Sequence, residues 1–259
     1  MKKSAKFLKP AEGIFLRNVR EIYIQKVQKY DFKAGAKLLV DKPKTWTSFD
    51  VVNKVRFKLK HTLGVKKIKV GHSGTLDPMA TGLLLLCTGK FTKKLEGFQG
   101  LPKTYTGTMK LGATTASYDA ECEEDETFPL DGITAEKIEK ARKKFLGKIE
   151  QVPPMFSAIK VDGQPLYKRA RKGEMIEVKP RTVEIYDFKI TNIELPYLDF
   201  EVACSKGTYI RSLAYDLGRA LNNGAYLTGL RRTEIGDHYI EEAWDLEELL
   251  LHIEENYEE

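Results

Sequence analysis

The sequence predicts an α+β fold in one domain with embellishments, and three observations support this. Of the 259 residues, 42% are hydrophobic and 10% are aromatic, which suffices for a substantial packed core. Extended and helical patterns mix without strict βαβ alternation, which disfavours a doubly wound sheet. The chain has no internal repeat and no linker rich in glycine and serine, so a second independent domain is not expected.

The first half of the chain is expected to hold a strand, a helix and two further strands. Residues 37–43, Lys-Leu-Leu-Val-Asp-Lys-Pro, predict a strand that Pro43 stops. Ser48 can cap a helix whose apolar residues repeat at helical spacing and which Gly64 can end. The apolar run at 83–87 predicts a short buried strand, and the alternation at 103–111 predicts another.

The second half is expected to mix loops, strands and helices, each indicated by its own pattern. In order, these are an acidic loop without apolar periodicity at 119–131, a helix at 134–146, a basic segment at 153–181, extended stretches at 183–193 and 197–204, a helix from about Thr208 with one apolar face, and a last helix that Asp245 caps.

Several classes of protein are excluded by composition and motif. No apolar run approaches the roughly 18 residues of a membrane span, and the basic N-terminus lacks the apolar region of a secretory signal. Three cysteines without a C-x-x-C pair fit a reducing compartment, which predicts a cytoplasmic protein. Neither a P-loop nor a nucleophile elbow is matched. The four histidines show no ligand spacing, so no metal site is predicted.

The charge of the chain is distributed unevenly. Residues 1–110 hold 24 lysines and arginines against 7 acidic residues, a net of +17, whereas residues 111–259 hold 19 against 30, a net of −11. A basic half joined to an acidic half indicates a polyanionic partner for one face, such as a nucleic acid. The alternative is that the lysines only solvate the surface, because asymmetry along a sequence need not become asymmetry in space.

The stretch from Gly71 to Gly82 carries the strongest local signal for chemistry. Its three glycines and one proline predict a tightly shaped loop between a basic segment and an apolar strand. Asp77 precedes Pro78, which restricts its backbone, so its carboxylate can be held at the floor of a cleft. The alternative is an ordinary turn in which Asp77 makes an Asx hydrogen bond.

A carboxylate with no metal and no histidine can act as a nucleophile if a nearby cation keeps it ionised. Arg211 is a candidate for that cation, because it lies in the first turn of a helix, where the dipole does not favour it. It could equally lie over the core with its charge in solvent. Tyr105 and Tyr209 could stack on a ligand or be half-buried strand residues, and Leu230 could be plain core.

Taken together, these segments resemble the TruB family, tRNA pseudouridine synthases that act on the T-loop uridine at position 55. The resemblance runs from about Leu38 to the end, in the family's order. The matching segments are Gly71–Gly82, Lys103-Thr104-Tyr105, Leu111-Gly112, Asp119, Gln151–Gly163 with Tyr167 and Ala170-Arg171, Cys204–Arg211 and Leu230-Arg231-Arg232. The family fold implies a mixed, largely antiparallel sheet flanked by helices, with an inserted thumb-like loop that binds RNA.

The resemblance also implies a role for each matched side chain. Asp77 would attack the target uridine at the ribose or at the base, in a reaction with no cofactor and no metal. Arg211 would pair with Asp77 and keep it anionic, and Tyr105 would stack on the base. The other pocket residues implied are His72, in the gap left by the flipped nucleotide, and Tyr209 and Leu230, beside the uracil. The thumb at 153–181 would place Lys160, Lys168, Arg169, Arg171 and Lys172 against RNA.

The resemblance thus implies residues 38–259 as the catalytic domain and the T arm of tRNA as partner, with no obligate protein partner inferred. Two features depart from the family pattern. A C-terminal RNA-binding module of the kind many relatives carry is not expected, and the basic residues 1–37 lie outside the match. We expect this extension to supply some of the missing electrostatic contact. The alternative function is a non-catalytic factor that binds tRNA or assists RNA folding, and other RNAs remain possible substrates.

Overall fold

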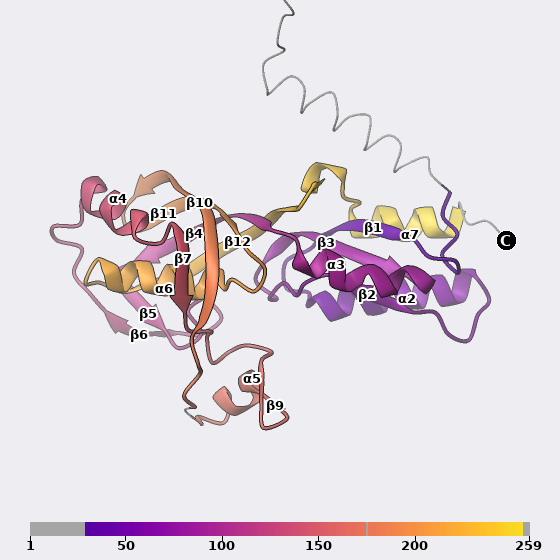
Figure 1. Ribbon diagram of the computed structural model, residues 1–259, viewed down its shortest axis with the longest axis horizontal. Helices are drawn as coiled ribbons and strands as arrows, with labels where there is room; N and C mark the ends of the chain where they lie inside the picture. The colour runs from indigo at the N-terminus through magenta and orange to yellow at the C-terminus, as the bar shows by residue number, and fades with distance from the viewer. Residues whose placement is uncertain (1–28, 175, 256–259) are drawn as a thin grey trace, which may run out of the picture.

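One long sheet organises the part of the chain that the structure, a computed structural model, describes, residues 29–174 and 176–255 (Figure 1). Within those residues its nine strands follow the order β1-β3-β12-β4-β11-β10-β7, with β2 beside β3 and β13 beside β12. The strands are β1 (Lys37–Lys42), β2 (Val70–His72), β3 (Thr81–Thr88), β4 (Lys103–Leu111), β7 (Gly147–Gln151), β10 (Arg181–Glu194), β11 (Tyr197–Cys204), β12 (Ala225–Ile235) and β13 (His238–Tyr239).

The pairing is antiparallel at every junction of this sheet except between β3 and β12, which run parallel. Two small hairpins are separate from this sheet: β5 (Ala113–Thr115) with β6 (Glu124–Thr127), and β8 (Lys160–Val161) with β9 (Gln164–Pro165). The helices are α2 (Ser48–Thr62), α3 (Leu95–Gly100), α4 (Ala135–Lys143), α5 (Leu166–Ala170), α6 (Ile210–Ala220) and α7 (Leu246–Glu255), with 3₁₀ turns η1 (Gly89–Lys94) and η2 (Ile240–Glu242). The predicted α+β class, with a mixed and largely antiparallel sheet, is confirmed.

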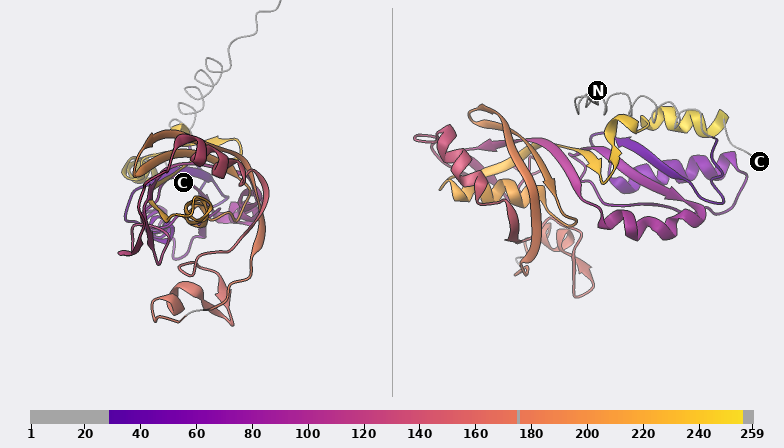
Figure 2. Two further views of the ribbon diagram at one scale, coloured as in Figure 1. Left: turned by 90° about the vertical axis from the view of Figure 1, so that its left-hand side faces the viewer. Right: turned by 45° about the horizontal axis from the view of Figure 1, so that its top comes forward.

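Helices cover the two halves of the sheet separately. In one half, α6 and α4 pack on β4, β10, β11 and β12, and Figure 2 shows these strands curving around α6. In the other half, α2 and α7 pack together on β1 and β3. The amphipathic spacing along α6 explains its place, because its apolar residues, among them Leu213, Ala214 and Leu217, are fully buried. The halves meet where β12 passes between β3 and β4.

Several predicted elements differ in detail from the structure. The predicted N-cap at Ser48 is wrong, because the cap of α2 is Thr47, which exchanges hydrogen bonds with Asp50 in a capping box. The segment predicted as an acidic loop contains β6, which pairs with β5 although all its residues are exposed. Strand β12, which crosses the centre of the sheet, was not predicted, because its two arginines interrupt the apolar alternation.

Part of the range 1–37 packs with the body of the protein. Tyr30, Phe32 and Ala36 are buried in the same cluster as α2 and α7. The Thr88 hydroxyl donates to the Phe32 carbonyl at 3.0 Å and accepts from the Ala36 amide at 3.0 Å, which ties this segment to β3. Residues 1–28 lie outside the described residues, so the electrostatic role expected of their lysines stays a prediction. No helix in the described part is long and apolar enough to cross a membrane.

The basic segment at 153–181 forms an arm, which we call the thumb. It carries the hairpin β8–β9 and helix α5, and it projects away from both halves of the sheet (Figure 1). Leu166 is fully buried inside it, whereas Lys160, Lys168, Arg171 and Lys172 are exposed. The thumb joins the sheet at β7 and β10, close to the start of α6.

Candidate active site

The loop that carries Asp77 lies between β2 and β3 and is hydrogen-bonded to α2. The Ser48 hydroxyl, buried in the first turn of α2, donates to the Leu76 carbonyl at 3.1 Å and accepts from the Leu76 amide at 2.8 Å. On the other side of Asp77, the Pro78 carbonyl accepts from the Thr45 amide at 2.8 Å. The backbone on both sides of Asp77 is therefore fixed, which aims its carboxylate.

Glycine is required at the end of this loop, where β3 meets β12. Gly82 has a φ of +105°, and a Cβ built there would lie 2.3 Å from the Arg232 carbonyl oxygen. A side chain at this position would push the two strands apart. The loop glycine thus lets β12 approach closely and bring Leu230 and Arg232 toward Asp77.

Arg211 lies between two carboxylates. Its Nε is 2.9 Å from Asp77 Oδ2, and its Nη1 is 3.4 Å from Asp119 Oδ2. The same guanidinium donates to the Ser117 carbonyl at 3.2 Å and to the Phe156 carbonyl at 2.9 Å. Asp119 is fully buried and Arg211 is 5% exposed, whereas the Asp77 side chain is 35% exposed. Asp77 is therefore the member of this network that a ligand can reach.

The surroundings of Asp77 alter its affinity for a proton. Burial raises the pKa of the Asp77 carboxyl above its ordinary value, and the neighbouring charges act in both directions. Arg211 and Lys42 favour the carboxylate, while Asp119 disfavours it. Because the net direction is upward, Arg211 moderates the effect of burial without reversing it.

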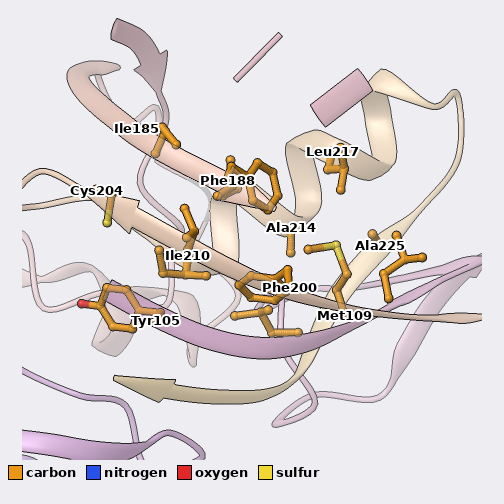
Figure 3. Packing of buried hydrophobic residues seen from close by; sticks show 14 of the residues in the cluster. Tyr105, Met109, Ile185, Phe188, Phe200, Cys204, Ile210, Ala214, Leu217 and Ala225 are labelled. Atoms are coloured by element: carbon orange, nitrogen blue, oxygen red, sulfur yellow. The ribbon is translucent and has the colours of Figure 1, made fainter. Parts of the chain in front are cut away.

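Asp77 and Arg211 both line a cleft of about 490 Å³. The structure brings five of the predicted site residues to its lining, together with one predicted RNA-binding residue: they are Asp77, Tyr105, Tyr209, Arg211, Leu230 and Arg171. Tyr105 stands on β4 at the edge of the core, with its hydroxyl directed away from the labelled core residues (Figure 3). Burial raises the pKa of that hydroxyl, which keeps it protonated at neutral pH.

The position of Tyr209 depends on a residue that sequence reasoning left without a role. Gln151, buried at the end of β7, accepts from the Tyr209 amide at 2.8 Å and donates to the Tyr209 carbonyl at 3.0 Å. Nearby, the Ser212 hydroxyl donates to the Val152 carbonyl at 2.8 Å. The root of the thumb is thus joined to the start of α6, from which Arg211 projects.

Arg232 is a second side chain that was not predicted at the site. It is 1% exposed, donates to the Leu83 carbonyl at 2.8 Å and to the Gly74 carbonyl at 3.1 Å, and hydrogen-bonds to Tyr105. It therefore links β3, the loop that carries Asp77 and β4. The motif Leu230-Arg231-Arg232 marked this stretch in the sequence, but only the fold shows which of its two arginines is buried at the site. Arg232 is buried there, whereas Arg231 pairs with Asp41 at 2.6 Å.

The other predicted residues lie outside the cleft lining. His72 is on β2, where its Nδ1 accepts from the Gly74 amide at 3.2 Å, and burial lowers the pKa of its ring. Arg169 donates to the Val161 carbonyl within the thumb and lies 3.6 Å from Asp162. The remaining three are exposed on the thumb: Lys160, Lys168 and Lys172. No cluster of three potential metal ligands occurs among the described residues.

Replacing Ser48 by alanine tests how far this loop depends on α2. The change removes both hydrogen bonds to Leu76 and leaves its buried amide unpaired, which should cost about 1–3 kcal/mol of stability. Urea unfolding measures that cost. The control is Thr134→Ala, which removes the cap of α4 at a cost of about 1 kcal/mol. We expect turnover to fall only in Ser48→Ala, and equal turnover in the two variants would contradict this role.

The fold is that of the pseudouridine synthases. The chain superposes on a chain of the crystal structure of a Cbf5–Nop10–Gar1 complex with a TM-score of 0.64 and 28% identity, covering 85% of this chain and 55% of that one. A structure of an H/ACA RNP bound to a substrate RNA containing 2′-deoxyuridine matches with a TM-score of 0.62 and 26% identity, over 85% of this chain and 54% of the other. This chain therefore spans little more than half of those solved chains.

Sequence comparison narrows the class to one family. Residues 60–210 match the model of the TruB family pseudouridylate synthase N-terminal domain, and the chain belongs to that family. It is 56% identical to the tRNA pseudouridine synthase B of Flavobacterium johnsoniae, over 83% of this chain and 95% of the relative. The protein of the same name from Phocaeicola vulgatus is 54% identical over 84% and 92% of the two chains.

Proposed function

We propose that this protein isomerises the T-loop uridine at position 55 of tRNA to pseudouridine, with Asp77 as the nucleophile. The observation that carries the proposal is the partly exposed Asp77 carboxylate at 2.9 Å from the buried Arg211, within a cleft that Tyr105 also lines. The tRNA substrate is supported by relatives more than 50% identical that are named tRNA pseudouridine synthase B. We likewise propose the cytoplasm as the place of action, because the substrate is found there.

The reaction rearranges bonds within one nucleotide without net oxidation. The Asp77 carboxylate adds either to C1′ of the ribose or to C6 of the uracil, and the bond between N1 and C1′ breaks. The uracil then turns, C5 bonds to C1′, the proton on C5 is lost, N1 gains a proton and Asp77 is released. Tyr105 would stack on the base close to C5, and Arg211 would favour the charged form of Asp77 before attack.

The shape of the cleft requires the base to leave its stack. A uridine folded within the T arm cannot present its glycosidic bond to a carboxylate at the floor of a cleft, so the nucleotide must flip, at a cost of a few kcal/mol. Contacts between phosphates and basic side chains can offset that cost. The thumb carries exposed cations, Lys168 among them, and one of them, Arg171, lines the cleft, which suits recognition of the folded arm by shape.

One experiment can test which uridine is modified and whether the chain acts without another protein. The purified chain alone is incubated with a tRNA transcript that carries tritium at C5 of its uridines, and the released label is counted. The control transcript has cytidine in place of the T-loop uridine. We expect one equivalent of label per tRNA from the first transcript and none from the second. Binding without release would support the non-catalytic alternative, and equal release would place the reaction at another uridine.

The raised pKa of Asp77 predicts how turnover depends on pH. The nucleophile must be the carboxylate, so activity is present above the pKa of Asp77 and is lost as pH falls through it. Because burial raises that pKa, the decline should begin at a higher pH than for an ordinary aspartate. Asp119→Asn removes a charge that raises the pKa of Asp77. In this variant the acidic limb of the pH profile, where turnover falls, should therefore move to lower pH. A limb that moves upward in single-turnover profiles would contradict the assignment.

A further inference from the structure

Four arginines among the described residues line the cleft, and they divide into two kinds. The inner two have partners within the protein: Arg211 forms ion pairs with two carboxylates and donates to two carbonyls, and Arg232 donates to two carbonyls. The outer two, Arg171 and Arg181, each lie over a tyrosine ring instead. Arg171 belongs to the thumb, where RNA contact was expected from sequence. Arg181 is both the last residue of that basic segment and the first residue of β10, and it was not among the side chains singled out for RNA contact.

Arg181 lies over an aromatic ring and forms no ion pair with any residue that the structure describes. Its guanidinium carbon lies 4.5 Å from the centre of the Tyr209 ring. Its Nε is buried and has no hydrogen-bond partner in the described part of the chain. The two carboxylates that line the cleft, Asp77 and Glu121, interact with Arg211, and neither forms an ion pair with Arg181.

The backbone fixes this arginine relative to the uracil pocket. Arg181 pairs with Gln151 in the register of β10 and β7, and Gln151 holds the Tyr209 backbone through both its amide and its carbonyl. Gln151 therefore positions both residues, Arg181 through backbone strand pairing and Tyr209 through its side-chain amide. A cation placed on a rigid strand in this way is organised before the ligand arrives, so little side-chain freedom remains to be lost on binding.

We propose that Arg181 binds a phosphate next to the flipped nucleotide. The inference rests on the proposed function, because it takes RNA as the occupant of the cleft. Uracil and ribose are uncharged, so the phosphodiesters are the only anions that such a substrate brings. A guanidinium stacked on an aromatic face keeps its N–H edge free for bidentate contact with phosphate oxygens, whereas an ammonium group lacks that geometry. Arg181 thus anchors the backbone of the nucleotide whose base lies beside Tyr209.

The test measures binding of a T-arm stem-loop RNA by fluorescence anisotropy across a salt series. The proteins are wild type, Arg181→Ala, Arg181→Lys and the control Arg219→Ala. Arg219 also lies over a tyrosine ring, that of Tyr215 at 5.9 Å, but outside the cleft lining. We expect Arg181→Ala to weaken binding about tenfold and to reduce the slope of log K against log salt by about 1. Arg181→Lys should keep the slope and recover only part of the affinity, and Arg219→Ala should match wild type.

A chemically modified RNA tests whether Arg181 contacts a phosphate next to the target uridine. In it, one phosphate flanking the target uridine is replaced by an uncharged methylphosphonate, on the 5′ side or on the 3′ side. One of the two replacements should weaken binding to wild type but have no further effect on Arg181→Ala. Equal effects of both replacements on the two proteins would overturn the proposal. If wild type does not bind the unmodified stem-loop at all, the proposed function fails instead. Urea unfolding of each variant checks the fold, and if Arg181→Ala does not fold, the comparison is made with the uncharged variant Arg181→Gln.

Discussion

Replacement of Asp77 by asparagine is expected to abolish pseudouridine formation while tRNA binding remains. The amide keeps the size of the side chain and can still accept a hydrogen bond from Arg211, so the cleft should keep its shape. It is not a nucleophile under these conditions, so turnover should fall by at least roughly three orders of magnitude. Nuclease digestion and nucleoside chromatography measure the product, and anisotropy measures binding.

Asp41 provides a matched control for that variant. It also pairs with an arginine, Arg231 at 2.6 Å, and its side chain is 33% exposed against 35% for Asp77. It lies outside the cleft lining. Asp41→Asn should therefore keep turnover near the wild-type rate. If the two variants lost activity equally, loss of a partly buried ion pair would explain both, and Asp77 would lose its assigned role.

Replacement of Arg211 by methionine is expected to have the second-largest effect, on stability as well as on activity. It removes the cation between Asp77 and the fully buried Asp119, which is left as an uncompensated charge. Breaking a buried pair in this way costs about 3–5 kcal/mol. It also raises the pKa of Asp77 further, because Arg211 is the largest influence that favours its carboxylate. Fewer molecules would then carry the charged nucleophile at neutral pH.

Urea unfolding and single-turnover kinetics separate the two effects. Arg231→Met removes a more exposed pair, with the arginine 40% exposed, and should cost no more than about 1 kcal/mol. The double variant Arg211→Met with Asp119→Asn removes the buried charge together with its partner, so it should recover part of the lost stability but not the activity. Because Asp119→Asn by itself lowers the pKa of Asp77, turnover of the double variant is compared with that of Asp119→Asn alone. Equal turnover in these two proteins would show that Arg211 acts only through stability.

The fold could be predicted where local pattern and tertiary structure agree. Strands 103–111 and 197–204 coincide with β4 and β11, because alternation matches a sheet that is buried on one face. The hydrophobic pattern did not predict strands whose position depends on contacts with distant parts of the chain. Strand β12 is held between β3 and β4, and its buried Arg232 is tolerated because carbonyls from distant strands and loops accept its hydrogen bonds. The sequence around Arg232 does not indicate which carbonyls accept its hydrogen bonds.

The same distinction applies to the site. Asp77 and Arg211 could be proposed from sequence because their segments are distinctive and match a family. Gln151 and Ser48 act by hydrogen bonds to the backbone of residues far away in the chain, so their roles appear only once the fold is known. Of the five predicted RNA-binding residues on the thumb, Arg171 lines the cleft, and the RNA-binding role of all five stays a prediction.

The central claim is that the Asp77 carboxylate performs the isomerisation of one tRNA uridine. The most direct measurement is a single-turnover reaction with a tRNA that carries tritium at C5 of the T-loop uridine alone, under saturating wild type or saturating Asp77→Asn. We predict complete release of the label by wild type and none by the variant, with equal amounts of RNA bound. Release by Asp77→Asn at the wild-type rate would contradict the claim.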